Sequence, residues 1–189
     1  MKTDTFREFY EELLSDTFDA ENQLIKALPK LAKAASSEEL ASAFEEHLEQ
    51  TKEHATRLEK VFQLHNAKPK RIKCKGMEGL IEEGAEVIKE YDEGDLRDAA
   101  LICAAQKVEH YEIAGYGTLR TFASMLGESE AQSLLEETLE EEKAADQTLN
   151  ELSESINPEA ASGEMEEEEE GKEVASSKKP NSRSKQRVA

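Results

Sequence analysis

The chain has 189 residues and a formal net charge of −19 at pH 7. Nucleic acids and anionic membrane surfaces attract proteins that carry a basic surface, so this charge argues against both classes of partner. No stretch approaches the roughly 18 apolar residues that a membrane span needs, and the N-terminal residues lack the pattern of a signal peptide. We therefore expect a cytoplasmic protein whose charge attracts metal ions and other cations.

Four long segments have apolar residues at every third or fourth position, which is typical of amphipathic α-helices. The first segment runs from about residue 4 to residue 35 and contains Pro29, a residue that can kink a helix. The second segment begins at Ser36 and Ser37, which suit the N-terminal cap of a helix, and its apolar stripe continues to Phe62.

The link between the second and third long segments is predicted to be partly helical. Residues 65–74 include a proline and a basic run, and they are expected to form a connection. A shorter helix is expected over about residues 77–91, and the turn-forming residues 92–95 follow it.

The third long segment starts near Asp95 and is broken by Gly127, and the fourth starts at Ser129. We expect Pro158 to close the fourth segment, since proline lacks the N–H that a helix interior requires. No segment shows the two-residue alternation of a surface strand over a useful length. The sequence therefore predicts an all-α fold.

The character of the chain changes from about residue 157. Residues 166–170 are five consecutive glutamates, and the end of the chain is basic and polar. Such a stretch buries too little apolar surface to offset the conformational entropy that ordering costs. We expect a helical domain over residues 1–156 and a disordered charged tail over residues 157–189, which would mainly aid solubility.

The sequence resembles itself at an offset of 91 residues. Residues 43–58 align without gaps on residues 134–149, and the same offset places Glu21 on Glu112. The first helical segment therefore corresponds to the third, and the second corresponds to the fourth. Two such pairs, joined by a link long enough to run the length of the molecule, predict a ferritin-like four-helix bundle with a long crossover that contains a short fifth helix.

Several acidic and histidine residues occupy positions where the helical period calls for apolar side chains. Burying a lone charge costs several kcal/mol, so buried carboxylates are normally paired or bound to metal. Several that converge in one bundle indicate a metal site. The repeat aligns Gln50 with Glu141, which adds a neutral oxygen ligand to the set. The predicted metal ligands are Glu21, His47, Gln50, Glu109, Glu112, Glu141 and Glu142.

These residues match the ligand pattern of di-iron bundles only in part. Such bundles take one Glu from each of two helices and a Glu-x-x-His from each of the other two. Glu21 and Glu112 supply the first part and are the expected bridging ligands. No Glu-x-x-His occurs in the chain, because His47 precedes Gln50 in the reverse order. His54 lies on the same helical face and is a weaker candidate ligand, and a core histidine is the alternative role for His47. Mixed carboxylate and imidazole ligands favour iron, manganese or zinc over calcium.

Five stretches of the sequence carry a resemblance to a known family. They are DAENQLIKALPKLAKAASS, HLEQTKEHATRLEKVF, CKGMEGLIEEG, DAALICAAQKVEHYEIAGYGTLRTFA and LLEETLEEEKAADQTL. Over about residues 4–155 the chain resembles the YciE/YciF family of bacterial ferritin-like proteins, and VEHYEIAGYGTL at residues 108–119 is the most specific match.

The resemblance implies a ferritin-like bundle, a homodimer, a link to stress responses and a di-iron centre. It places the predicted ligands other than Gln50 at the recurrent inward polar positions of the family. The family commonly has Glu where this chain has Gln50. A mononuclear site, or a weaker second metal, is therefore the alternative to a full di-iron centre.

Two functions are compatible with these features. In the first, the carboxylates hold two Fe(II) ions that react with dioxygen or peroxide, as a ferroxidase or a peroxidase would. In the second, the polar residues form a hydrogen-bonded core that sets the helix register, and the protein acts as a dimeric acidic interaction module. Iron storage in a cage is less favoured, because no shell-forming element is evident.

Overall fold

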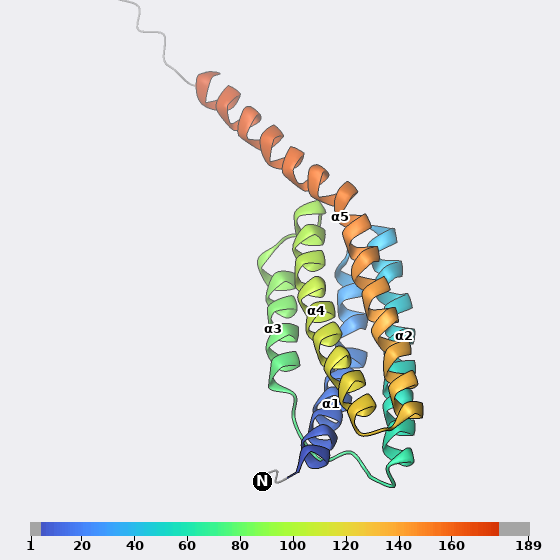
Figure 1. Ribbon diagram of the computed structural model, residues 1–189. Helices are drawn as coiled ribbons and strands as arrows, with labels where there is room; N and C mark the ends of the chain where they lie inside the picture. Colours follow the sequence, from blue (N-terminus) through green and yellow to red (C-terminus); the bar gives the residue numbers. More distant parts are fainter. Residues whose placement is uncertain (1–4, 178–189) are drawn as a thin grey trace, which may run out of the picture.

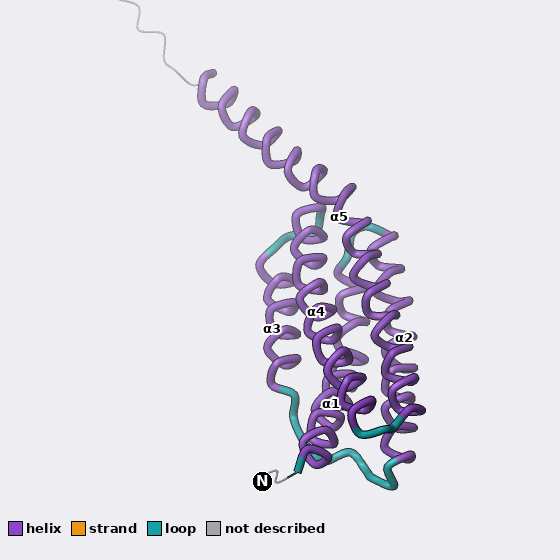
Figure 2. The backbone as a smooth tube through the Cα atoms, in the orientation of Figure 1, coloured by secondary structure: helices purple, strands orange, loops and turns teal. Residues whose placement is uncertain are grey.

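The computed structural model describes residues 5–177 of the chain, with side chains up to residue 162. This part of the chain folds into five α-helices and contains no strand, as Figure 2 shows. The helices are α1 (Phe6–Ala34), α2 (Glu38–Leu64), α3 (Lys75–Glu90), α4 (Asp95–Met125) and α5 (Ser129–Ser177). The predicted all-α fold is confirmed, and each predicted helix begins close to its expected position.

The four long helices form an elongated bundle, and α3 lies along one side of it (Figure 1). α1 and α2 form one antiparallel hairpin, and α4 and α5 form the other. The hairpins meet where α1 packs on α4 and α2 packs on α5. The crossover over residues 65–94 contains α3, which packs against α4 and α1. This arrangement is the four-helix topology with one long crossover that the repeat predicts.

Local capping interactions explain two of the helix boundaries. The side chain of Ser37 accepts a hydrogen bond from the backbone N–H of Leu40 at the start of α2. At the end of α4, Gly127 adopts a φ of 75°, which glycine tolerates more readily than other residues. The N–H of Glu128 then donates to the carbonyl of Ala123 at 2.9 Å, which closes the turn.

Both prolines that the sequence places in or near helices lie inside them. α1 continues through Pro29, which is exposed, and α5 continues through Pro158 to Ser177, so the predicted helix end at Pro158 is wrong. The helix-forming residues Glu151 and Glu154 before Pro158, and Glu159, Ala160 and Ala161 after it, offset the loss of one hydrogen bond. The backbone is helical over residues 157–177, where the sequence predicts a disordered tail. Residues 178–189 lie outside the described part, and the boundary between domain and tail stays a prediction.

The core consists of two apolar clusters with a layer of polar side chains between them. In α4, residues up to Val108 pack in one cluster and residues from Tyr116 onward pack in the other, so Glu109 and Glu112 lie between the two. α2 runs through the two clusters in the same order, whereas α1 and α5 run through them in the reverse order. We call the buried polar residues at this level the polar layer, and they are Glu21, His47, Thr51, His54, Glu109, Glu112 and Glu142.

Asp98 of α4 connects the two hairpins at one end of the bundle. Its carboxylate is only 1% exposed and accepts hydrogen bonds from the backbone N–H of Ser36 at 2.8 Å and of Ser37 at 2.7 Å. It therefore satisfies backbone donors at the start of α2, which have no partner within the helix.

Replacing Asp98 is expected to destabilise the fold more than most single substitutions do. Asp98→Ala leaves the part-buried N–H groups of Ser36 and Ser37 without an acceptor, so it should lower the free energy of unfolding by about 2–3 kcal/mol. Urea denaturation followed by circular dichroism measures this loss. Asp95→Ala, an exposed position at the start of the same helix, is the control and should cost less than about 1 kcal/mol. Equal losses in the two variants would contradict the assigned role of Asp98.

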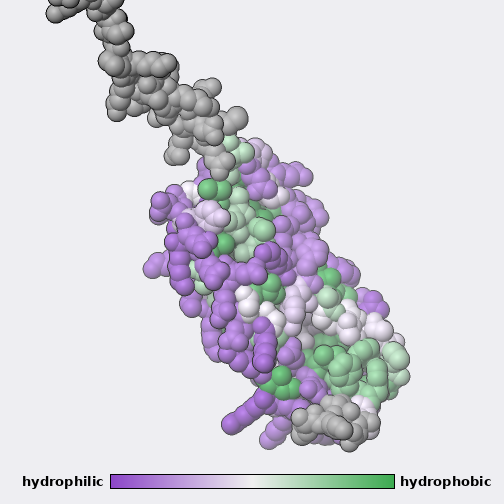
Figure 3. Space-filling view, turned by 90° about the vertical axis from the view of Figure 1, so that its left-hand side faces the viewer, coloured by the Kyte–Doolittle hydropathy of each residue, from purple (hydrophilic) through white to green (hydrophobic). Residues whose placement is uncertain are grey.

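No helix among residues 5–177 has the length and apolar character that crossing a membrane demands. One end of the bundle does carry an apolar patch, which Figure 3 shows close to the start of the described chain. Phe6, Phe9 and Met125 are exposed there, and the rings of Phe6 and Phe122 lie 4.7 Å apart. Apolar surface of this kind is common at contacts between proteins.

Candidate metal centre

The polar layer brings together side chains from all four long helices. Two sets of residues each offer ligand atoms that all lie within 4.8 Å of one another. The first set is His47, Glu109, Glu112 and Glu142, and the second set is Glu21, His54 and Glu142. Because Glu142 belongs to both sets, two metal positions at this level would share one carboxylate.

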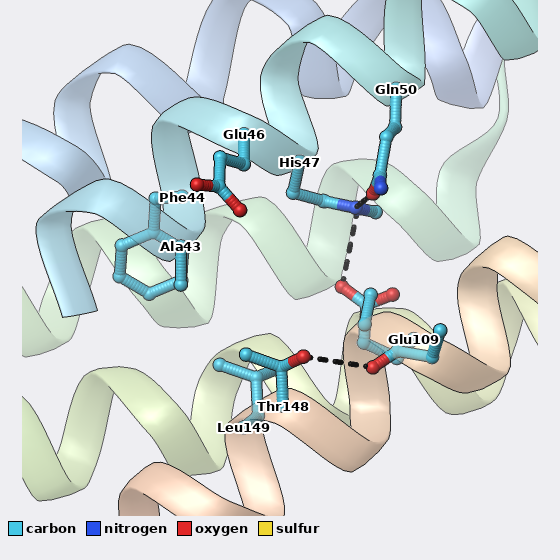
Figure 4. A pocket seen from close by; sticks show the side chains of 10 residues that line it. Ala43, Phe44, Glu46, His47, Gln50, Glu109, Thr148 and Leu149 are labelled. Atoms are coloured by element: carbon cyan, nitrogen blue, oxygen red, sulfur yellow. Dashed lines mark hydrogen bonds and ion pairs between the residues drawn. The ribbon is translucent and has the colours of Figure 1, made fainter. Parts of the chain in front are cut away.

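In the first set, the imidazole of His47 faces two carboxylates. Its Nε2 lies 3.3 Å from Oε1 of Glu109 and 3.8 Å from Oε2 of Glu142. Its Nδ1 lies 3.4 Å from Oε1 of Gln50, near the surface of α2 (Figure 4). An acceptor on the Nδ1 side favours a proton on that nitrogen, which leaves Nε2 as the potential ligand.

In the second set, the imidazole of His54 is fully buried. Its Nδ1 lies 3.0 Å from Oε1 of Glu142 and 3.8 Å from Oε1 of Glu21. Its Nε2 lies 2.9 Å from Oε2 of Glu141. On the other side of Glu21, the hydroxyl of Tyr116 donates a hydrogen bond to Oε1. Glu141 therefore orients His54, and Tyr116 orients Glu21, which are the two groups that face Glu142.

Many atoms of the polar layer have no hydrogen-bond partner among the described residues. Both oxygens of Glu112 are in this state, as are one oxygen of Glu21 and one of Glu109, whereas the oxygens of Glu142 face the imidazoles of His54 and His47. Each such buried group costs roughly 1–3 kcal/mol. Divalent cations would satisfy them, and carboxylates mixed with imidazole suit iron, manganese and zinc. The residues present therefore fit a metal of this class.

Burial and mutual repulsion raise the pKa values of the carboxyl groups in the polar layer. Desolvation and the charge of Glu142 raise the pKa of Glu21 from 4.5 to about 8. The same two causes, in the same order, raise the pKa of Glu112 well above its usual range. Burial is also the largest cause of the raised pKa values of Glu109 and Glu142. Protons and metal ions would therefore compete for this site.

Five of the seven predicted ligands belong to the two sets, whereas Gln50 and Glu141 belong to neither. Gln50 is exposed and approaches only the outer side of His47. The side chain of Glu141 is 32% exposed and pairs with Arg57, whose Nη2 lies 2.9 Å from Oε1. Burial acts to raise the pKa of Glu141, but the hydrogen bond and charge of Arg57 outweigh this effect and lower the pKa. Metal binding by any of the seven stays a prediction.

His54 is the residue whose role the sequence-based interpretation underrates. The repeat contains the missing signal, because the offset of 91 aligns Thr51 with Glu142 and His54 with Ala145. α2 thus has Thr51-x-x-His54, and α5 has Glu142-x-x-Ala145. Each helix keeps one half of the Glu-x-x-His motif, so a search for the whole motif in one helix finds nothing.

Comparisons with known proteins agree with this architecture. Residues 5–162 match the family described as a domain of unknown function, DUF892. Protein YciF of Escherichia coli (strain K12) is 54% identical over 153 residues, which are 80% of this chain and 92% of that protein. The crystal structure of the E. coli stress protein YciF matches with a TM-score of 0.81 at 52% identity, covering 82% of this chain and 99% of that one.

A second solved structure is that of YcfI from Rhodopseudomonas palustris, whose description suggests a structural role. It matches with a TM-score of 0.76 at 39% identity and covers 79% of this chain and 97% of that one. The family match extends over most of the described residues, and the resemblance that the sequence motifs carry is confirmed. The chain belongs to the DUF892 family and is a relative of YciF.

Proposed function

We propose that the polar layer binds two iron ions and that Glu142 is the ligand they share. The observation that carries this proposal is the group of buried carboxylate oxygens without hydrogen-bond partners, above all both oxygens of Glu112. A fold that only needed helix register would leave fewer of these costly groups unsatisfied. The E. coli relative is described as a stress protein, and we extend the proposal to a role of this chain in a stress response.

The residues around the proposed ligands hold them in position. Glu141 accepts a hydrogen bond from Nε2 of His54, which leaves Nδ1 directed at Glu142. Gln50 has the corresponding place beside His47. Partners of this type fix the tautomer and orientation of a metal-bound imidazole. Iron in this environment would supply oxidation chemistry with dioxygen or peroxide as the oxidant.

An anaerobic titration of the metal-free protein with Fe(II) tests the proposal. The wild type should saturate near about two irons per chain, as other carboxylate bundles of this topology do. Glu112→Gln should bind about one iron, because it replaces a carboxylate whose two oxygens lack hydrogen-bond partners by a neutral amide with a single oxygen. Glu154→Gln, at an exposed position of α5, is the matched control and should behave as the wild type. Parallel titrations with Mn(II) and Zn(II) rank the three metals.

A structural role is the second candidate, because YcfI is described in such terms and the polar layer separates two apolar clusters. In that case the metal-free protein would take up no iron, and Glu112→Gln would change only its stability. The acidic protein would then act as an interaction module. The homodimer implied by the resemblance stays a prediction, for which the apolar patch at Phe6, Phe9 and Met125 is the surface we expect to pair.

A further inference from the structure

A small pocket leads from the surface between α2 and α5 to the polar layer. Its volume is about 90 Å³, and two of its lining residues, His47 and Glu109, belong to the first set of proposed ligands. Ala144 and Thr148 of α5 line it at exposed positions. Figure 4 shows His47 reaching across the pocket toward Glu109. The pocket is thus the place where the surface approaches the first set.

The repeat explains why there is space at this position. Ala145 lines the pocket, and the offset of 91 makes it the equivalent of His54. The first hairpin therefore has an imidazole at this position, and the second has only a methyl group. His47, which has Thr138 as its own equivalent, approaches the first set from α2 instead. Because Ala145 has no imidazole, one side of the first set has no protein ligand.

Polar atoms at the inner end of the pocket lack partners. His47 is 6% exposed and Glu109 is 3% exposed, so both side chains are more than nine-tenths buried. Oε2 of Glu109 forms no hydrogen bond with any described residue, and Nε2 of His47 has only the carboxylates of Glu109 and Glu142 beside it, at 3.3 Å and 3.8 Å. A ligand at this end would therefore meet a carboxylate oxygen that lacks a partner, next to the imidazole of His47.

The size and charge of the pocket restrict that ligand. A volume of about 90 Å³ suits a few water molecules or another small molecule. The lining carboxylates of Glu46 and Glu109, together with the net charge of −19, disfavour anions. The walls also include the apolar side chains of Phe44 and Leu149. A small neutral molecule fits these conditions.

We propose that this pocket is the access route and binding place of a small neutral oxidant, dioxygen or hydrogen peroxide, next to the iron site. The inference rests on the proposed function for the identity of the reaction, but the pocket itself is testable without iron. Entry through the gap at Ala145 would bring the molecule to His47 and Glu109 without movement of a helix.

Thr148→Phe is designed to close the pocket. Thr148 is exposed, and its hydroxyl donates only to the carbonyl of Ala144 in its own helix, at 3.0 Å. Thr118→Phe is the matched control, because Thr118 is an exposed residue of α4 that donates to Ala114 at 2.9 Å and does not line the pocket. Ala144→Leu, at the same mouth, is a second closing variant in case Thr148→Phe does not fold.

The first measurement uses metal-free protein and dissolved dioxygen, whose paramagnetism speeds the NMR relaxation of nearby methyl groups. In the wild type, we expect the effect at the methyl of Ala145 in α5 to be several-fold larger than the effect at the methyl of Ala123. Ala123 is fully buried near the C-terminal end of α4. Thr148→Phe should remove most of this difference, and Thr118→Phe should preserve it. No excess at Ala145, or an excess that Thr148→Phe leaves unchanged, would overturn the proposal.

The second measurement loads each variant with Fe(II) without air and follows oxidation by dioxygen or by hydrogen peroxide in separate stopped-flow experiments. Thr148→Phe should keep the iron stoichiometry of the wild type and slow oxidation several-fold. Slowing with only one oxidant would assign the pocket to that oxidant, and slowing with neither would refute the access route. If the protein binds no iron but Ala145 still shows the dioxygen effect, the proposed function fails while the pocket stands.

Discussion

Glu142→Gln is expected to abolish the binding of both iron ions, whereas loss of any other single ligand should spare part of it. The reason is that Glu142 is the one residue common to both sets of potential ligands among the described residues. Its replacement should weaken iron binding by more than about 100-fold. This loss of affinity is larger than the loss that usually follows replacement of a residue that only orients a ligand. Anaerobic Fe(II) titration followed by equilibrium dialysis measures the loss.

The neighbouring Glu141 provides a sharp comparison for this prediction. Glu141→Gln should keep the stoichiometry of the wild type and weaken affinity by about 10–100-fold, because Glu141 orients His54 from outside the two sets. The unfolding temperature of metal-free Glu142→Gln should be equal to or higher than that of the metal-free wild type. Glutamine keeps the shape of the glutamate side chain and removes a buried charge. Full iron binding by Glu142→Gln would exclude the shared-ligand arrangement.

The stability of the metal-free protein is expected to fall as the pH rises from about 4.5 to about 8. Glu21 has a pKa of about 8 in the folded protein against a usual value of 4.5, so the folded state retains the proton that the unfolded chain releases. Its favourable contribution is complete below the unfolded pKa and is lost as the pH passes the folded one. The raised pKa values of Glu112 and Glu142 add to the same trend.

Urea denaturation of metal-free protein at a series of pH values tests this trend. Glu21→Gln should flatten the dependence, because glutamine has no proton to lose. Glu154→Gln changes an exposed carboxylate and should leave the dependence unchanged. Bound iron should also flatten the dependence, since a cation stabilises the ionised carboxylates. Stability that rises with pH over this interval would show that the polar layer is hydrated or differently paired.

Helix boundaries and topology were predictable because they depend on local chemistry and on the repeat. Ser37 caps α2 through a residue three positions away, and Gly127 ends α4 through its own φ, so neither needs the rest of the fold. Equivalent hairpins bury equivalent faces, so the offset of 91 also predicted which helices pair. Pro158 is the exception, because its effect on α5 depends on whether its neighbours sustain the helix.

The sequence by itself determined the helices, the two hairpins and the presence of buried carboxylates and histidines. Only the tertiary structure decided which of these face one another. Glu141 and Glu142 are adjacent and point about 100° apart, so the helical period allows either to face inward. The packing of α5 against α2 directs Glu142 into the polar layer and Glu141 toward Arg57. The axial alignment of the hairpins likewise places His54 beside Glu142, because contacts between helices depend on their relative shift and not on spacing within either one.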